Sequence, residues 1–232
     1  MPRLPFLLLI LASCLLLAAC GEDDEPAPGS AARTPAPAAE TPEPAASGAE
    51  CGKVAEPEAK RDGGRSKPKR TLEAGTTYVA TVATSCGDFE ITLDAEQAPK
   101  TGGSFASLAR AGFFDDLVFH RIVPGFVIQG GDPTGTGTGG PGYSVTEAPP
   151  EDLAYTRGVV AMAKTADEAP GTSGSQFYVV TGEDAQLPPE YALLGKVTKG
   201  LDVVEAIGAV PTGPDERPVD PVVIESVKVG EG

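Results

Sequence analysis

The clearest pattern in the chain is an alternation of apolar and polar residues over residues 89–94. Phe89, Ile91 and Leu93 are apolar, and the residues between them are polar. A segment of this kind buries one face, so it predicts a half-buried β-strand. Residues 78–84 precede it across a short Ser-Cys-Gly-Asp link. The two segments are therefore predicted to form a β-hairpin.

Two segments have helical spacing instead. The first begins at Pro99, places Phe105 and Leu108 on one side, and ends at Gly112. Proline suits the first helical position and glycine the exit, so the segment predicts one amphipathic helix of moderate length. A second, shorter helix is predicted over residues 202–207.

The later apolar segments are short and are typical of strands. They are residues 117–123, 126–129, 159–163, 176–180, 193–197 and 222–229. Together with the hairpin they give many short strands, separated by Gly and Pro, and only two helices. This pattern favours an antiparallel barrel or sandwich over an alternating α/β fold.

The beginning of the chain predicts export. Residues 1–19 have a short positive start and an apolar run, as in a signal peptide. The segment Leu-Ala-Ala-Cys-Gly at 17–21 resembles the bacterial lipobox, in which Cys20 is lipidated and becomes the mature amino terminus. The resemblance implies an extracytoplasmic protein that is anchored to the cell membrane through lipid on Cys20. An uncleaved signal anchor and a plain secretory signal are the alternatives, and both export the domain.

Composition then divides the rest of the 232 residues. Residues 20–50 are rich in Ala, Pro, Glu and Thr and should be a disordered tether. Residues 51–76 are expected to be a linker with a basic part, which is either solvated or close to anionic lipid headgroups. Residues 77–232 form the predicted domain. The net charge of −15 argues against nucleic acid as a partner.

The four cysteines have different expected fates. Cys14 lies in the signal peptide and Cys20 carries the lipid, which leaves Cys51 and Cys86. In an oxidising compartment a remaining pair usually joins, so a disulfide between Cys51 and Cys86 is predicted. Free thiols are the alternative. No metal site is expected, because two Cys and one distant His are too few ligands.

Three candidate motifs lead to no chemistry. The glycine-rich residues 130–142 lack the Gly-Lys-Ser/Thr exit of a phosphate loop, so they are expected to be an ordinary loop. Residues 171–175 have the wrong spacing for a serine-hydrolase elbow. The single histidine, His120, lies in an apolar run and is assigned a structural role.

One segment carries a specific resemblance. Residues 119–132 read Phe-His-Arg-Ile-Val-Pro-Gly-Phe-Val-Ile-Gln-Gly-Gly-Asp, which resembles the signature of the cyclophilin family. Residues 158–164, 174–180 and 194–204 agree with the same family in order and spacing. The resemblance implies a closed eight-stranded antiparallel barrel capped by two α-helices, with the substrate groove on its outer face. It also implies a peptidyl-prolyl cis/trans isomerase that binds proline-containing polypeptides and needs no cofactor. Together with the export signal, this predicts a protein that assists the folding of exported proteins. Nothing in the sequence suggests an obligate interface, so a monomer is expected.

The resemblance also implies roles for individual residues. Rotation about an X-Pro bond breaks no bond, so it needs a donor that favours the twisted amide rather than a nucleophile. Arg121 would be that donor, and Gln129 would orient it and bind substrate. The groove residues that would grip the proline and its neighbours are Phe126, Val127, Ala163, Lys164, Gln176, Tyr178, Leu187 and Tyr191.

The chain departs from the common family pattern in the groove wall. Many members have Trp where Gln186 aligns and His where Tyr191 aligns, and Lys164 and Tyr178 stand where Asn and Phe are common. Lys164 is expected to act through its backbone. A non-catalytic peptide-binding or chaperone module on the same fold is the alternative function. A lipoprotein that captures a small solute would need a larger, two-lobed chain.

Overall fold

The structure is a computed structural model that describes residues 51–232. The predicted signal peptide, the lipid site at Cys20 and the tether of residues 20–50 lie outside the described residues. The described residues belong to one compact unit. Within them, no helix is long and apolar enough to cross a membrane.

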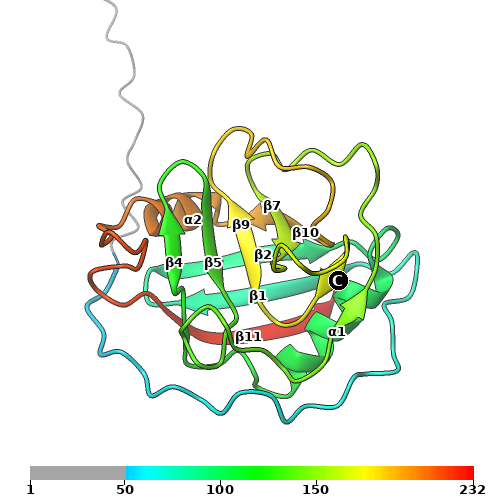
Figure 1. Cartoon of the computed structure of the whole chain (residues 1–232), viewed down its shortest axis with the longest axis horizontal. Helices are drawn as coiled ribbons and strands as arrows, with labels where there is room; N and C mark the ends of the chain where they lie inside the picture. The colour runs from blue at the N-terminus through cyan, green and yellow to red at the C-terminus, as the bar shows by residue number, and fades with distance from the viewer. Residues whose placement is uncertain (1–50) are drawn as a thin grey trace, which may run out of the picture. The chain divides into compact units, whose positions relative to one another are not determined.

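A nine-stranded, curled antiparallel sheet forms the body of the domain (Figure 1). In spatial order its strands are β3 (Leu117–Val118), β11 (Val223–Glu231), β1 (Tyr78–Thr84), β2 (Gly87–Leu93), β10 (Leu193–Lys199), β7 (Val159–Met162), β9 (Phe177–Val180), β5 (Val127–Gly130) and β4 (Arg121–Val123). Two short strands, β6 (Val145–Thr146) and β8 (Thr172–Ser173), pair separately. Sequence patterning missed these two, because two residues are too few to show a period.

The expected closed eight-stranded barrel is wrong in both count and closure. Residues 117–123, predicted as one strand, divide into β3 and β4 at Phe119 and His120, which makes nine strands in the sheet. β3 and β4 are its two end strands and do not pair with each other among the described residues. Because only two residues join them, the sheet ends lie at most about 11 Å apart along the chain, at 3.80 Å per Cα step. The polypeptide itself, rather than a hydrogen-bonded ladder, links the two ends.

The predicted hairpin forms the centre of the sheet. β1 and β2 pair in register from Tyr78 with Leu93 to Thr84 with Gly87. Their alternate residues point inward, so that Val82, Phe89 and Ile91 are almost completely buried. The period-two pattern in the sequence is therefore the inner face of the sheet.

Two helices cover the open ends of the curled sheet, as the sequence predicted (Figure 1). α1 (Pro99–Arg110) has proline at its first position and buries Phe105 and Leu108. The Phe105 ring stacks on Phe114 with centroids 4.7 Å apart. α2 (Leu201–Gly208) buries its apolar side against the sheet. Both helices are short, so packing of their apolar faces stabilises them more than helix propensity does.

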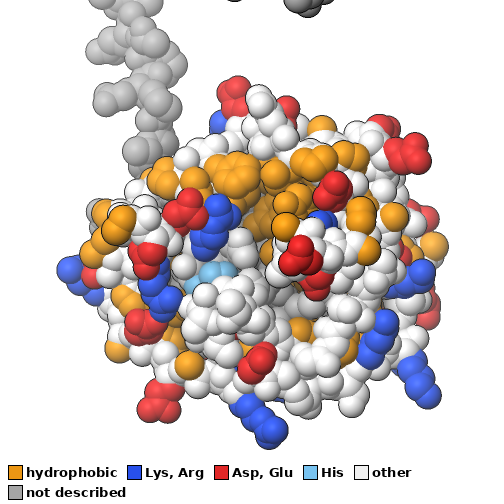
Figure 2. Space-filling model, in the orientation of Figure 1, with side chains coloured by type: hydrophobic (Ala, Val, Ile, Leu, Met, Phe, Trp, Pro, Cys, Tyr) orange, Lys and Arg blue, Asp and Glu red, His pale blue; other side chains and the backbone are white. Residues whose placement is uncertain are grey.

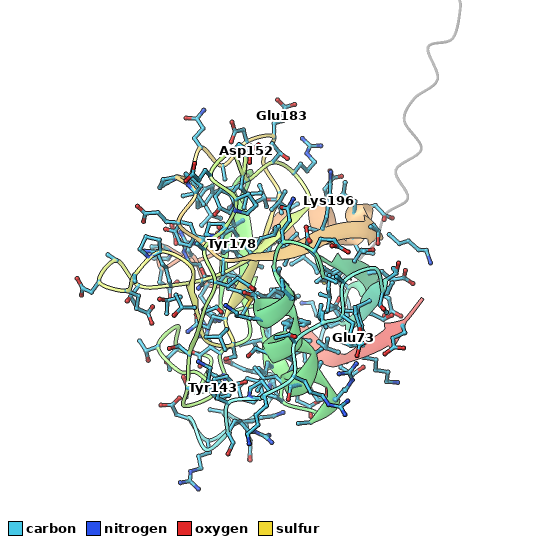
Figure 3. The ribbon with its side chains drawn as sticks, turned by 90° about the vertical axis from the view of Figure 1, so that its right-hand side faces the viewer. Glu73, Tyr143, Asp152, Tyr178, Glu183 and Lys196 are labelled. Atoms are coloured by element: carbon cyan, nitrogen blue, oxygen red, sulfur yellow. A yellow bond between two sulfur atoms is a disulfide. The ribbon has the colours of Figure 1, made fainter. Side chains whose placement is uncertain are left out.

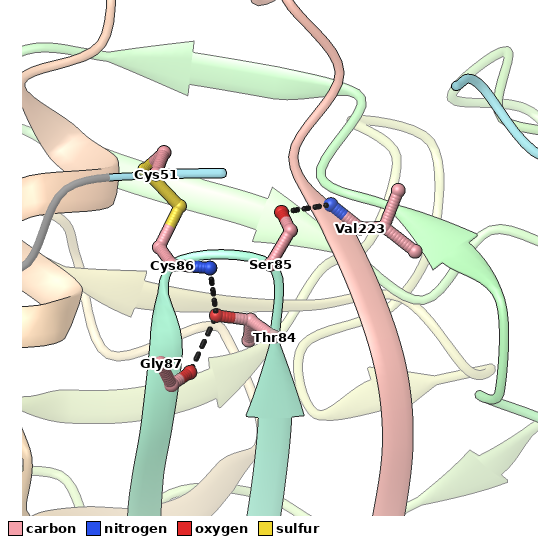
Figure 4. Close-up of a disulfide and its surroundings, with 6 residues drawn as sticks. All are labelled: Cys51, Thr84, Ser85, Cys86, Gly87 and Val223. Atoms are coloured by element: carbon pink, nitrogen blue, oxygen red, sulfur yellow. Dashed lines mark hydrogen bonds between the residues drawn. A yellow bond between two sulfur atoms is a disulfide. The ribbon is translucent and has the colours of Figure 1, made fainter. Parts of the chain in front are cut away.

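The segment predicted as a linker runs along the surface of the domain (Figure 1). We call residues 51–72 the strap. Its backbone N–H groups donate to loop carbonyls of the domain, from Gly63 to Gly140 at 2.9 Å and from Arg65 to Pro141 at 3.0 Å. At its start, Cys51 forms a disulfide with Cys86 in the β1–β2 turn (Figure 4). The strap is thus fixed at its first residue and again along its length.

Candidate functional site

The site is built on the β4–β5 hairpin. The Phe126 N–H donates to the Val123 carbonyl at 3.0 Å, and Pro124 and Gly125 occupy the middle of this turn. Gly125 has φ of 70°, a value that glycine adopts without strain. The hairpin register then places Arg121 directly opposite Gln129.

Strand register extends this pair into a row across the outer face. Gln129 on β5 lies opposite Tyr178 on β9, and Tyr178 lies opposite Ala161 on β7. Side chains alternate between faces, so the intervening residues, such as Ile122 and Ile128, point inward and are completely buried. One set of short strands therefore supplies both the core and the floor of a surface site.

A pocket of about 240 Å³ lies on this outer face. Figure 2 shows a hollowed band of hydrophobic side chains, flanked by charged ones, across this side of the molecule. The pocket is lined by nine of the ten predicted groove residues: Arg121, Phe126, Val127, Gln129, Ala163, Lys164, Tyr178, Leu187 and Tyr191. The tenth, Gln176, lines a neighbouring pocket of about 590 Å³ that shares Gln129, Ala163 and Lys164 with the first.

The Arg121 guanidinium is held on two sides at the edge of the pocket. Its Nε donates to Glu216 Oε2 at 2.5 Å, and its Nη1 donates to Gln129 Oε1 at 3.5 Å. The guanidinium carbon lies 6.0 Å from the centroid of the Phe126 ring. Arginine has five N–H donors, and the other three have no hydrogen-bond partner among the described residues. They are available to a ligand in the pocket.

Gln129 is oriented in turn by Gln176. Gln129 Nε2 donates to Gln176 Oε1 at 3.0 Å, and Gln176 Nε2 donates to the carbonyls of Gly137 and Gly139 at 3.0 and 2.9 Å. The glycine-rich segment is a loop, as predicted, and its carbonyls fix which way the Gln176 amide faces. The chain of amide contacts therefore begins in the glycine-rich loop and ends at Arg121.

The buried Asp132 carboxylate accepts several hydrogen bonds from this loop. Its carboxylate accepts hydrogen bonds from Thr134 N and Oγ1 and from the N–H groups of Gly137 and Gly139, at 2.5 to 3.2 Å. Burial alone raises the pKa of Asp132, but these hydrogen bonds outweigh it and lower the pKa below its usual value. The residue is completely buried, so the loop closes around an ionised carboxylate.

Three tyrosines pack together at one end of the pocket, and two of them, Tyr178 and Tyr191, line it. The Tyr178 ring meets Tyr191 edge-on with centroids 5.7 Å apart, and Tyr155 meets both rings at 6.3 and 6.0 Å. The Tyr155 hydroxyl donates to the Tyr191 carbonyl at 2.7 Å and accepts from its N–H at 3.0 Å. Burial raises the pKa of Tyr155 to about 12. Tyr155 thus fixes the backbone that carries Tyr191.

Tyr178, labelled in Figure 3, lines the pocket with little of its own surface exposed. It is 4% exposed, and its hydroxyl has no hydrogen-bond partner among the described residues. Burial also raises the pKa of Tyr178 above its ordinary value. The ring fills the floor of the pocket, whereas the hydroxyl is an uncompensated polar group.

Lys164 was expected to act through its backbone, but its side chain also makes contacts at the site. Its ammonium lies 3.4 Å from Glu190 Oε2 and 5.5 Å from the centroid of the Tyr191 ring, and the side chain is only 4% exposed. It also donates to the carbonyls of Thr165 and Glu168 at 3.3 and 3.2 Å. The side chain folds back and joins the strand end to the Glu190–Tyr191 wall.

His120 lies outside both pockets, in the link between β3 and β4. Burial lowers the pKa of His120 below 6.5. The Asp132 charge raises this pKa, whereas the charges of Arg217 and Arg121 lower it. The structural role assigned to it is consistent with this position. Among residues 51–232, no cluster of three or more His, Cys, Asp or Glu is arranged to hold a metal ion.

Sequence reasoning missed the residues that support the site. Glu216 lies 95 positions from Arg121, and no local pattern connects them. Tyr155 is hidden for the same reason, since it contacts the wall 36 positions later. Asp132 was inside the quoted signature, and its position directly after two glycines, ahead of a loop, was the available signal.

The geometry defines a class of protein: a curled antiparallel sheet with an arginine at the edge of an apolar surface pocket. The sequence model described as "Cyclophilin type peptidyl-prolyl cis-trans isomerase/CLD" matches residues 79–229. The chain therefore belongs to the cyclophilin-type peptidyl-prolyl cis-trans isomerase family.

Named relatives and solved structures agree with this membership. The chain is 40% identical over 171 residues to "Peptidyl-prolyl cis-trans isomerase A" of Mycobacterium tuberculosis, with 66% of this chain and 92% of that one covered. It is 41% identical over 169 residues to "Peptidyl-prolyl cis-trans isomerase B" of Streptomyces anulatus, with 65% and 95% covered. A Cryptosporidium parvum cyclophilin-type isomerase structure matches with a TM-score of 0.62 and 33% identity, over 67% of this chain and 99% of that one. A structure of the same Cryptosporidium protein was obtained in the presence of the dipeptide Ala-Pro.

Proposed function

We propose that this protein accelerates cis/trans rotation of X-Pro peptide bonds, with Arg121 as the catalytic residue. The observation that carries the proposal is the position of a guanidinium with free N–H donors at the edge of an apolar pocket. Family membership supports the same activity.

The chemistry requires only that the twisted amide be favoured. The planar X-Pro amide is held by resonance, with a rotation barrier of about 18 to 20 kcal/mol. In the twisted state the nitrogen regains its lone pair and can accept a hydrogen bond. Arg121 can supply that bond, because its guanidinium stays charged and its geometry is rigid. An interaction that exists only in the twisted state lowers the barrier directly.

The pocket can hold the proline ring in place while the other side of the X-Pro bond rotates. Phe126, Val127 and Leu187 line a cavity of about 240 Å³, in which the proline ring can be held by apolar contact. Ala163 and Lys164 lie at the end of β7 and can hold the residue before the proline through their backbone. The chain on one side of the bond then turns while the ring stays in place.

The deciding experiment compares the full chain with Arg121→Ala and Arg121→Lys. We expect the parent to accelerate isomerisation of an Ala-Pro-Phe peptide, measured by NMR exchange, and Arg121→Ala to lose about 100-fold or more in kcat/KM. Arg121→Lys should recover little, since an ammonium cannot keep the forked geometry. A folded parent that accelerates nothing but still binds the peptide would leave a non-catalytic peptide-binding or chaperone module.

We also propose that the protein is a monomeric lipoprotein of the outer face of a membrane, anchored at Cys20, with exported polypeptides as its clients. The lipobox-like sequence at residues 17–21 supports the anchor. The Cys51–Cys86 disulfide supports an oxidising compartment. Among residues 51–232, Val219 is the only exposed large hydrophobic residue, which supports the monomer.

The anchor is tested by substitution of the modified residue. Cells producing the full chain should place it in the membrane fraction with a lipid-dependent mass increase, and Cys20→Ser should lose both the mass increase and the membrane association. Cys14→Ser is the matched control and should change neither. An unmodified parent would rule out the anchor and leave one of the two other export signals.

A further inference from the structure

The loop between α2 and β11, residues 211–219, reaches back to the edge of the site. It is closed by its own hydrogen bonds: the Gly213 N–H donates to the Arg217 carbonyl at 2.8 Å, and the Glu216 N–H donates to the Gly213 carbonyl at 3.0 Å. Glu216 lies at the turn of this loop. The loop is therefore a preformed support rather than a loose connection.

Glu216 contacts β4 twice, once by side chain and once by backbone. Its Oε2 accepts from Arg121 Nε at 2.5 Å, and its carbonyl accepts from the Ile122 N–H at 2.7 Å. The backbone contact fixes the loop beside the strand that carries Arg121. The side-chain contact then holds the guanidinium through Nε and uses none of its Nη hydrogens.

The backbone of Glu216 adopts a conformation that its side chain does not favour. Its φ is 63°, and only two other non-glycine residues among 51–232 have a positive φ. Such conformations persist in folded proteins where the surroundings fix them, and they gather at functional sites. Glycine or asparagine would fit this backbone better, but neither would reach Arg121.

The loop is also anchored on its outer side. Arg217, the next residue, forms an ion pair with Glu56 of the strap and donates to the Gly135 carbonyl at 2.8 Å. Glu216 and Arg217 therefore hold the loop between β4 on one side and the strap and the glycine-rich loop on the other. A loop held from both sides can keep the Glu216 carboxylate at a constant place.

We propose that Glu216 is a positioning residue that holds the Arg121 guanidinium in the orientation needed for catalysis, an inference that rests on the function proposed above. A bond at Nε leaves the three Nη hydrogens that have no partner among the described residues for the prolyl amide. Without it the side chain would keep only the longer contact with Gln129 and would sample several rotamers. Glu216 does not line the pocket, so it should affect the rotation step rather than binding.

The test uses three substitutions at Glu216 in the full chain. We expect Glu216→Ala to lower kcat by roughly 10- to 100-fold with little change in KM, because a misplacement on the order of 1 Å can cost about 100-fold. Glu216→Gln keeps an acceptor at the same reach and should retain most of the activity. Glu216→Asn suits the backbone but is too short, so it should behave like Glu216→Ala. Activity of Glu216→Asn equal to the parent would overturn the proposal.

A double substitution separates positioning from a general structural effect. If Glu216 acts through Arg121, adding Glu216→Ala to Arg121→Ala should cause no further loss. A further loss of similar size would show that Glu216 acts elsewhere. Glu205→Gln removes a comparable ion pair, that of Glu205 with Arg157 at 3.1 Å, outside both pockets and should leave kcat unchanged.

A readout without substrate separates this inference from the proposed function. In the parent, NMR should show a distinct, slowly exchanging Nε–Hε signal that disappears in Arg121→Lys and is thereby assigned. Glu216→Ala should shift that signal and speed its exchange, whereas Glu205→Gln should not. If the parent lacks activity but this shift occurs, the proposed function fails and the contact stands. An unchanged signal in Glu216→Ala would refute the contact itself.

Discussion

A few residues of one hairpin serve the core and the site together. Arg121 and Gln129 face outward from β4 and β5, while their neighbours Ile122 and Ile128 are completely buried. The buried pair fixes the strands, and the strands fix the outward pair. Substitutions of the outward residues should therefore change function with little cost in stability, and substitutions of the inward ones should do the reverse.

His120 provides a pH prediction at the residue scale. Because burial lowers its pKa below 6.5, the unfolded chain takes up a proton at a higher pH than the folded chain. The contribution of His120 to the free energy of unfolding is thus complete above about pH 6.5 and is lost as the pH falls from there toward the folded-state pKa. NMR of the single imidazole should show this low pKa directly.

Comparison of urea unfolding at pH 7.5 and 5.5 tests the consequence. The parent should lose stability over this range, and His120→Gln, which cannot titrate, should lose less. The Asp132 carboxylate does not confuse the result, since its own lowered pKa acts at more acidic pH. An imidazole that titrates at or above 6.5 in the folded protein would contradict the prediction.

The unpartnered Tyr178 hydroxyl gives a second prediction at this scale. Tyr178→Phe should raise the free energy of unfolding by about 1 kcal/mol, because an uncompensated buried polar group costs about 1 to 3 kcal/mol. The ring remains, so kcat/KM should change less than about twofold. Tyr155→Phe is the matched control: its hydroxyl makes two hydrogen bonds, and its loss should destabilise by a similar amount. Destabilisation by Tyr178→Phe would show that the hydroxyl has a partner.

At the scale of elements, the Asp132 carboxylate accepts most of the hydrogen bonds that the first half of the glycine-rich loop donates. Asp132 accepts four hydrogen bonds from Thr134, Gly137 and Gly139. Asp132→Asn replaces one acceptor oxygen by a donor and should cost about 2 to 3 kcal/mol of unfolding free energy. Gln176 contacts the same loop, so kcat/KM should also fall. Chemical unfolding and the peptide assay measure the two effects.

A matched turn elsewhere controls for the amide itself. Asp184 accepts one hydrogen bond, from the Gln186 N–H at 2.8 Å, and is exposed. Asp184→Asn should change stability by less than about 0.5 kcal/mol, as ordinary surface substitutions do. If both variants unfolded at the same urea concentration as the parent, Asp132 could not be the organiser of the loop.

The elements that the sequence predicted well are those with a period. The alternation of Phe89, Ile91 and Leu93 and the spacing of Phe105 and Leu108 became β2 and α1. The strand over residues 117–123 was predicted as continuous, because no Gly or Pro interrupts this segment. The break comes from tertiary structure: its first part pairs with β11 and its last part with β5.

The lining of the candidate pocket was predictable where the family signature carries it. Nine of ten predicted residues line one pocket, which the resemblance, and not periodicity, brought together. Glu216 and Tyr155 were missed because each contacts the site across a long sequence separation. The side chain of Lys164 was missed because only folding shows that Glu190 lies within 3.4 Å of it.

At the scale of the whole molecule, the strap contributes contacts to the predicted domain of residues 77–232. It donates backbone hydrogen bonds to the glycine-rich loop through Gly63 and Arg65, and Glu56 forms an ion pair with Arg217 beside Glu216. Asp62 accepts from the Gly140 N–H at 2.8 Å and lines the larger pocket. A fragment beginning at residue 77 would lose all these contacts, so activity should be compared on chains that keep the strap.

The Cys51–Cys86 disulfide is the covalent end of this arrangement. It joins residues 35 positions apart and restricts the unfolded chain, an effect of about 2 to 4 kcal/mol for loops of this size. Replacement of both cysteines by serine should lower the free energy of unfolding by that amount. Cys51 and Cys86 lie outside both pockets, so kcat/KM should change little under conditions that keep the protein folded. Any decrease should come from a weaker contact between Glu56 of the strap and Arg217. Reduction of the parent should reproduce the loss of stability, and reduction of the double variant should do nothing. If the urea midpoint of the parent is the same with and without reductant, the two thiols are free and noncovalent contacts alone hold the strap.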